Sequence, residues 1–195
     1  MKIIWPFCQT TVVFIVEKLK PINPTSALFI KFGQGGEWED ECITNGTLRL
    51  GFREFFHDDL IAGKFKIVRN YYKTRTSAPW VTIYENQIKN FYQTDETVLW
   101  ITFYKQRLWW CFATNKFKGK GTELKLRYVK EKWRCTDILG NELLVDNLSG
   151  QLLKTQGFQS TICNVEAFDY LVKKINGKDI PEVKQVKSDF LVCEF

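Results

Sequence analysis

The period of the hydrophobic pattern changes near Thr97, and this change constrains the fold more than any other feature. Before it, residues 80–92 carry large apolar side chains three and four positions apart, which predicts a helix with one buried stripe. After it, residues 98–104 and 108–113 form two short apolar runs around a polar turn, which predicts a β-hairpin. The chain therefore combines a helical segment with a later group of strands.

The other expected elements are short and irregularly ordered. Strands are expected at 27–32, 47–52, 123–129 and 132–137, and helices at 37–43, 53–60, 63–72 and 165–175. Because strands and helices do not alternate, a parallel doubly wound sheet is not expected. We expect an α+β fold, in the form of a small curved β-barrel with flanking helices.

Two prolines in the segment 21–26 mark the clearest break in the chain. We expect residues 1–26 to form an N-terminal arm or strand, residues 27–183 to form the main domain, and residues 184–195 to be a tail or the start of a linker. The apolar stretch 3–16 is too short and too polar to cross a bilayer, and no small-residue cleavage site follows it. We therefore expect a cytoplasmic protein that does not associate with membranes.

The charge balance is mildly basic. Lys and Arg number 28 against 22 Asp and Glu, a net charge of +6, which favours anionic partners. No two of the six cysteines form a C-x-x-C pair, so neither a zinc site nor a redox motif is expected, and we expect no cofactor. Buried thiols in a reducing compartment fit this spacing better than disulfides do.

Catalytic motifs are scarce. His57 is the only histidine, which excludes sites that need two histidines, and its neighbours Asp58 and Asp59 predict a surface position. The triplets at 123–125 and 182–184 read Glu-x-Lys, a pattern that leaves a metal-dependent nuclease open as an alternative. We expect no catalytic residue in this chain.

Aromatic and basic residues gather in the second half. Trp100, Trp110 and Trp133 lie in or near predicted strands, where they either pack in the core or form an aromatic cage for a flat ligand. Residues 116–134 hold eight Lys or Arg against two Glu, and Gly119 with Gly121 predicts that the first part of this segment is a loop. Such a segment is either a solvated strand face or a surface that holds phosphates.

The segments 29–39 (FIKFGQGGEWE) and 48–52 (LRLGF) resemble the PUA-like superfamily, and most closely its EVE-type domains. Residues 100–103, 148–150 and 161–163 resemble later family segments, so the similarity covers about residues 27–180. The resemblance implies a curved barrel with a pocket that accepts a modified base, in some relatives flipped out of the duplex. It also implies a separate nuclease domain or subunit, as in modification-dependent restriction endonucleases.

The resemblance places the first strand–helix loop, residues 34–38, at the pocket. Acidic residues follow this glycine-rich loop and would repel phosphate, so we expect it to approach a base closely and not to hold a phosphate. We expect the base pocket to be drawn from Gln34, Trp38, Trp100, Tyr104, Trp110 and Trp133. We expect phosphate contacts from Arg107, Lys116, Lys118, Lys120 and Arg127.

The leading hypothesis is therefore a module that binds DNA carrying a methylated or hydroxymethylated cytosine. An RNA- or tRNA-associated PUA-like module is the main alternative. A metal nuclease and a protein-interaction domain remain as further alternatives from other classes.

Overall fold

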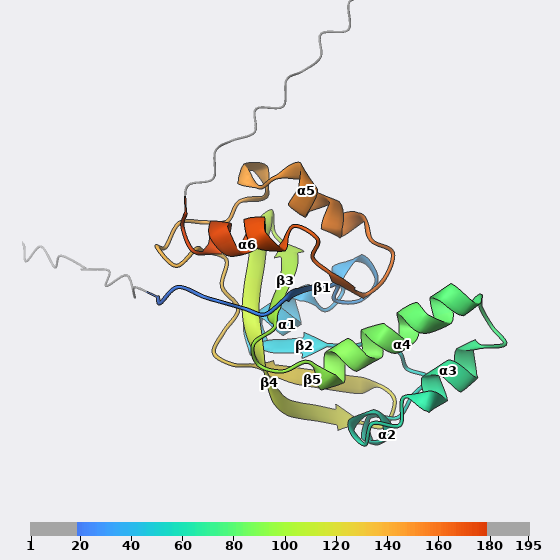
Figure 1. Cartoon of the computed structure of the whole chain (residues 1–195). Helices are drawn as coiled ribbons and strands as arrows, with labels where there is room; N and C mark the ends of the chain where they lie inside the picture. Colours follow the sequence, from blue (N-terminus) through green and yellow to red (C-terminus); the bar gives the residue numbers. More distant parts are fainter. Residues whose placement is uncertain (1–18, 179–195) are drawn as a thin grey trace, which may run out of the picture.

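A computed structural model of the chain describes residues 19–178. Most of the expected arm at 1–26, the tail at 184–195 and the second Glu-x-Lys triplet lie outside these residues. The described part is α+β, with a six-stranded mixed sheet and helices on both sides of it (Figure 1). The α+β expectation is thereby confirmed.

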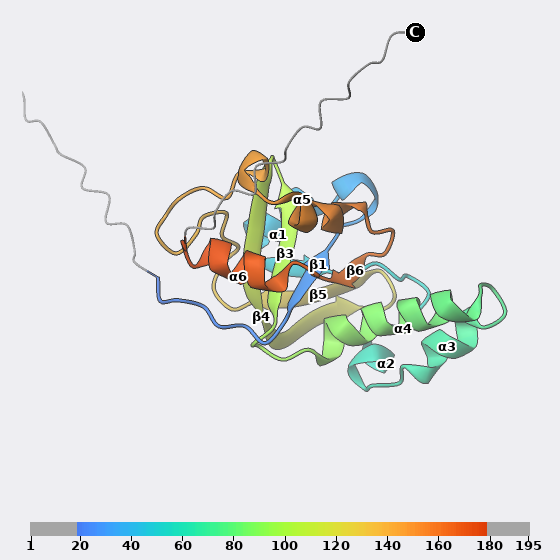
Figure 2. The same ribbon diagram turned by 45° about the horizontal axis from the view of Figure 1, so that its top comes forward.

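The strands of the sheet follow the order β2-β5-β4-β3-β1-β6. Their bounds are β1 Ala27–Ile30, β2 Thr47–Arg49, β3 Leu99–Tyr104, β4 Arg107–Lys120, β5 Leu124–Val129 and β6 Ile162–Asn164. β1 and β3 are parallel, and the other neighbours are antiparallel. Figure 2 shows β6 beside β1 at one edge. The pairing in the described residues runs from β2 to β6 without joining these two edges, so a closed barrel is not formed.

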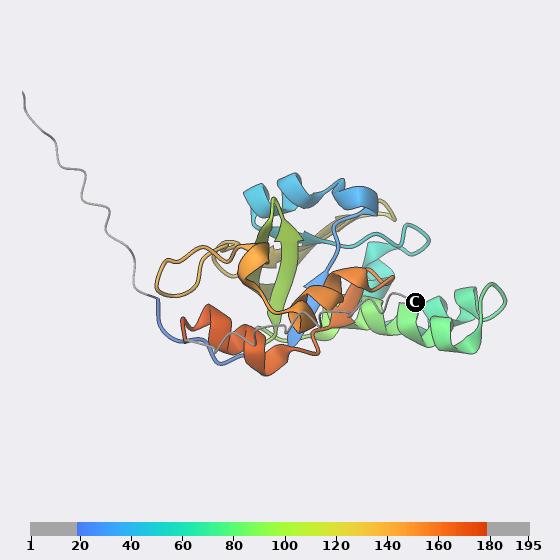
Figure 3. The same ribbon diagram turned by 90° about the horizontal axis from the view of Figure 1, so that it is seen from above.

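Six α-helices of residues 19–178 flank the sheet. They are α1 Glu39–Asn45, α2 His57–Ile61, α3 Lys66–Tyr72, α4 Ala78–Gln93, α5 Gly150–Leu153 and α6 Phe168–Ile175, with short 3-10 turns η1 Gln34–Gly36, η2 Val145–Asn147 and η3 Lys154–Gly157. Figure 3 shows α1 on one side of the sheet and α4 and α6 on the other. α4 begins after Ser77, with Pro79 in its first turn, as its sequence predicts.

Two hydrophobic clusters cover opposite faces of the central strands. The first contains Leu28, Trp100 and Cys111, and packs against α4 and β2. The second contains Phe29, Ile101 and Trp110, and packs against α5 and α6. Neighbouring residues of one strand enter different clusters because strand side chains alternate, so β1, most of β3 and the first half of β4 are covered on both faces.

Two expectations for the second half are wrong. Residues 132–137 do not form a regular strand; isolated bridges join Arg134 to Trp110 and Thr136 to Glu142. The basic segment expected as a loop instead continues β4 to Lys120, past a shift of register between Ala113 and Phe117. Cross-strand hydrogen bonds to β5 keep this segment extended, which overrides the weak strand propensity of its lysines and Gly119.

Candidate nucleic-acid interface

A cavity lies where the parallel strands β1 and β3 end. Its volume is about 300 Å³, and it opens to solvent. Its lining is Phe29, Lys31, Phe32, Gly33, Gly35, Gly36, Glu39, Thr102, Phe103 and Gln156. The carboxyl ends of parallel strands commonly hold ligands in open sheets, because loops diverge there and leave a crevice.

The glycine loop forms one wall of this cavity. Gly33, Gly35 and Gly36 all have positive φ, at 79°, 64° and 80°, a region that other residues rarely adopt. A Cβ on Gly36 would also lie 2.6 Å from the Glu39 carboxyl carbon. The loop closes through a hydrogen bond from the Trp38 amide to the Phe32 carbonyl, 3.0 Å long. These constraints bring bare backbone to the cavity wall, so a ligand can approach it closely.

The cavity combines aromatic walls with a few polar groups. The rings of Phe29 and Phe103 lie 5.7 Å apart at 55°. Lys31 donates a hydrogen bond to the Phe158 carbonyl, which holds the lysine across the rim. Burial raises the pKa of the Glu39 carboxyl above its ordinary value. Such a site suits a flat ring that offers hydrogen-bonding atoms along its edge.

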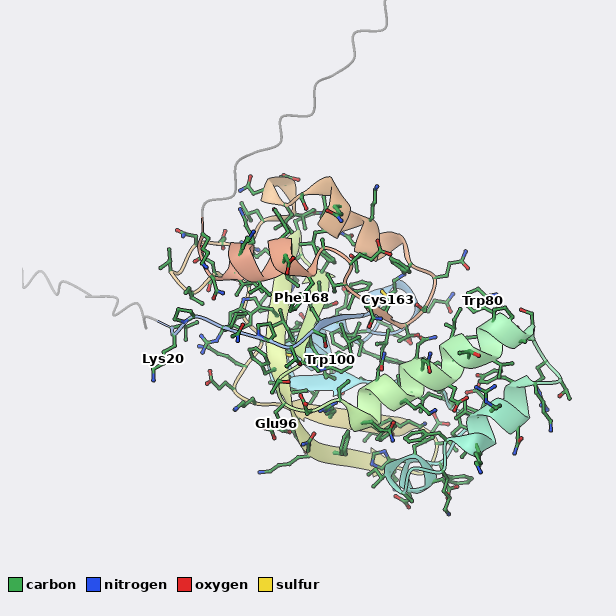
Figure 4. The ribbon with its side chains drawn as sticks, viewed as in Figure 1. Lys20, Trp80, Glu96, Trp100, Cys163 and Phe168 are labelled. Atoms are coloured by element: carbon green, nitrogen blue, oxygen red, sulfur yellow. The ribbon has the colours of Figure 1, made fainter. Side chains whose placement is uncertain are left out.

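The three tryptophans expected at the pocket do not gather there. Trp100, Trp110 and Trp133 are all buried, and none lines the cavity. The indole N–H groups of Trp110 and Trp133 donate to the Thr136 and Thr47 carbonyls, at 2.8 and 3.1 Å. Trp100 belongs to β3 and is fully buried near the centre of the molecule (Figure 4). These residues pack the core, and the expected tryptophan cage is not formed.

The other three expected pocket residues lie near the cavity without lining it. Gln34 is exposed in η1. Trp38 is half-buried, with the Arg49 guanidinium 4.3 Å from its ring centre. The Tyr104 hydroxyl donates to the Asp40 carboxylate, which ties the tip of the β3–β4 hairpin to α1.

The expected phosphate contacts divide into accessible and inaccessible residues. Lys116, Lys118 and Lys120 are exposed and alternate along β4, so they share one face of the strand. On the neighbouring strand, Leu126 lies opposite both Lys118 and Arg49, so the lysine row continues towards Trp38. Arg107 is paired with Glu142 at 2.9 Å.

Arg127 is the exception among these basic residues, because it is fully buried. Its guanidinium donates to Thr114, Phe91, Thr94 and Asn115 through five hydrogen bonds of 2.6–3.1 Å. Burial lowers its pKa to about 10, and the guanidinium stays charged at neutral pH. The expectation that it contacts phosphate is therefore wrong: Arg127 fastens the end of α4 to β4.

His57 is buried, contrary to the expected surface position. Its Nδ1 lies 2.9 Å from the Tyr92 hydroxyl, and its ring lies against Gly119. Lys125, in the first Glu-x-Lys triplet, is also fully buried, whereas the Glu123 side chain is 70% exposed. The two ends of this triplet therefore do not share an environment.

Sequence reasoning missed most of the cavity. Phe29, Phe103 and Thr102 were assigned to strands, but the parallel pairing that brings them to the glycine loop joins segments more than 70 residues apart, as Phe29 lies opposite Ile101. Lys31 and Gln156 carried no distinguishing pattern. The useful signal was the glycine loop, which predicted close approach to a ligand.

Within residues 19–178, no helix has the length and apolar character needed to cross a membrane. No group of three potential metal-ligating side chains is found in the same described part. Four cysteines fall there and all are free thiols, of which Cys42 and Cys111 are buried. Comparison with protein-family models, curated proteins and solved structures finds no match to this chain, so the resemblance to EVE-type domains remains an expectation from the sequence.

Proposed function

We propose that this chain is a nucleic-acid-binding module that takes a single base into the cavity beside the glycine loop. The observation that carries the proposal is this cavity, with aromatic walls, bare backbone and a few polar side chains at the ends of β1 and β3. Its volume of about 300 Å³ lies at the lower end of the range for ligand sites, which suits one ring better than a dinucleotide.

The polar groups favour cytosine as the base. Glu39 is a hydrogen-bond acceptor, and acidic side chains accept from the exocyclic amine of cytosine. Lys31 and Thr102 are donors for the carbonyl oxygen and ring nitrogen on the same edge. Phe29 and Phe103 supply apolar surface for a methyl or hydroxymethyl group at the opposite edge. A base in a duplex reaches such a cavity only after it is flipped out of the stack.

The lysine row of β4 supplies the phosphate contacts in this proposal. Lys116, Lys118 and Lys120 are exposed on one strand face, and Arg49 with Trp38 connects that face to α1 and the glycine loop. The acidic side chains of α1 disfavour phosphates directly at the cavity. The sugar–phosphate backbone of the nucleic acid therefore passes over the lysines of β4, and only the flipped base approaches the glycine loop.

The test is binding of duplexes that carry one 5-methylcytosine, one 5-hydroxymethylcytosine or no modification, together with RNA of the same sequence. We expect a modified duplex to bind about tenfold more tightly than the unmodified one, since one extra methyl group in an apolar pocket contributes roughly 1–3 kcal/mol. Equal, weak and salt-sensitive binding of all duplexes would contradict the selective function. Tighter binding of the RNA, without a response to modification, would instead assign the module to RNA.

Variants connect the binding to the cavity. Phe103→Ala should abolish the preference for modified cytosine, because it removes apolar surface beside the methyl group. Glu39→Gln should weaken binding of modified and unmodified duplexes alike, because both bases carry the exocyclic amine. Phe168→Ala is the matched control, because Phe168 packs on the same hydrophobic cluster as Phe103 but does not line the cavity (Figure 4). If Phe168→Ala reduces the preference as much as Phe103→Ala does, the effect reflects stability and not the site.

A further inference from the structure

A second groove, separate from the glycine-loop cavity, lies beside the first half of β4. Its volume is about 390 Å³. Its lining is Leu19, Lys20, Ile22, Trp110, Cys111, Phe112, Lys130, Glu131, Lys132 and Arg134. No residue is common to the two linings. The groove therefore needs an explanation of its own.

Hydrogen bonds hold each of the three segments that form the groove. Trp110 and Arg134 exchange backbone bonds of 2.8 and 2.9 Å, and the Lys130 amide donates to the Phe112 carbonyl at 2.7 Å. The third segment is held by the Asn176 side chain, which accepts from the Ile22 amide and donates to the Ile22 carbonyl at 2.8 and 2.9 Å. The groove is thus formed before any ligand binds.

The floor of the groove is apolar and partly aromatic. Trp110 and Phe112 meet edge to face, with ring centres 6.4 Å apart. Trp110 is buried and its indole N–H is bonded to the Thr136 carbonyl, so the half-buried Phe112 ring supplies the accessible aromatic surface of the floor. Leu19 and Ile22 add aliphatic side chains to the lining. A flat ring would bury this surface.

The rim is strongly basic. Four of the lining side chains are Lys or Arg and one is acidic. That acid, Glu131, pairs with Arg134 at 2.7 Å, and Lys130 makes only a long contact of 3.9 Å with Glu96. Among residues 19–178, Lys132 makes no salt bridge within 4.0 Å. The rim therefore holds positive charge that a bound anion would complement.

We propose that this groove is a nucleotide-binding site, which takes an aromatic ring on its floor and a phosphate at Lys130 and Lys132. The apolar floor and the basic rim each match one half of a nucleoside phosphate. The same chemistry comes from a free nucleotide or from one nucleotide of a single strand. The site does not depend on base binding at the glycine loop, because the two linings are separate.

The experiment titrates the folded protein with thymidine 5′-monophosphate and follows the indole N–H signals by NMR, with Trp110→Phe used for assignment. We expect the Trp110 signal to shift on binding. Thymidine alone and inorganic phosphate alone should each bind at least tenfold more weakly, because each lacks one half of the contacts. An unmoved Trp110 signal, or equal binding of phosphate and the nucleotide, would overturn the proposal.

Matched lysine variants locate the phosphate. Lys132→Gln should weaken nucleotide binding about three- to fivefold, the loss expected for one exposed ion pair. Lys116→Gln removes an equally exposed lysine that does not line the groove, and should leave this affinity unchanged. Equal losses in both variants would show non-specific attraction and would overturn the site.

A pentathymidylate strand distinguishes the two sources. Tighter binding than the monophosphate, still lost in Lys132→Gln, supports the site and assigns it to a nucleotide within a strand. Equal binding supports the site and assigns it to a free nucleotide. Selection of modified cytosine should be unaffected by Lys132→Gln, so failure of this proposal and failure of the proposed function can be told apart.

Discussion

Arg127→Met tests whether the buried arginine is a structural anchor or a contact for nucleic acid. Methionine keeps an apolar stem that can still pack beside Trp100 and Phe117, over which the guanidinium now lies at 5.9 and 5.4 Å. The change removes the charged group and its five hydrogen bonds together. The carbonyls of Phe91, Thr94 and Thr114 then lose these donors.

The cost follows from those carbonyls. Each buried polar group left without a partner costs about 1–3 kcal/mol of stability. Removal of the desolvated charge offsets part of this cost. We therefore expect Arg127→Met to lower the free energy of unfolding by about 3–5 kcal/mol. Arg127→Lys keeps the charge but cannot reproduce the fork of donors, so we expect a loss of about 2 kcal/mol.

Urea denaturation followed by circular dichroism measures these losses. Lys118→Met is the control, because it removes an exposed basic residue from the strand next to β5 and should change stability by less than about 0.5 kcal/mol. The reasoning is refuted if Arg127→Met costs less than about 1 kcal/mol. It is also refuted if Arg127→Lys, while fully folded, loses as much affinity for nucleic acid as Lys118→Met does.

Three further predictions concern buried groups. Burial lowers the pKa of Lys125 from 10.5 to about 8, so the cost of its charged amine is fully present below pH 8 and is lost as the pH rises from 8 to above 10.5. Between pH 7 and 10, urea denaturation should show the unfolding free energy of the wild type rising by about 2 kcal/mol relative to Lys125→Met. Gly119→Ala should lower the free energy of unfolding by about 1–3 kcal/mol, because its Cβ would overlap the His57 ring. The same change made in a His57→Ala background should cost much less, and additive losses in this double-mutant cycle would contradict the contact. Trp100→Phe removes a buried indole N–H that has no hydrogen-bond partner among residues 19–178, so urea denaturation should show the free energy of unfolding falling by less than about 2 kcal/mol. If the folded Trp100→Phe variant lost affinity for nucleic acid, the tryptophan-cage hypothesis would be restored.

Local patterns predicted the elements better than their arrangement. The β3–β4 hairpin and helix α4 were predictable because their periodicity and turn chemistry are contained in the segments themselves. The β1–β3 pairing was not, because it joins Phe29 to Ile101 across a helical region that carries no register signal. The cavity depends on that pairing, so only its glycine loop was visible in the sequence.

Charge was the least reliable guide to exposure. The segment 116–134 predicted a uniformly basic surface, yet alternation in β5 sends Lys125 and Arg127 into the core while Lys116, Lys118 and Lys120 remain outside. The sequence shows the charge of Arg127 but not the carbonyls at the end of α4 that accept its hydrogen bonds. His57 was misplaced for the same reason, because its partner Tyr92 lies 35 residues away.

The two hydrogen bonds between the Asn176 side chain and the Ile22 main chain hold the first and last described segments of the chain together. Residues 154 positions apart are held side by side by two hydrogen bonds. A short linker could therefore join these two points, and new ends could be opened at the exposed Gly121 turn between β4 and β5. By the same geometry, this module can be grafted into a surface loop of a host protein without pulling the host's flanking segments apart.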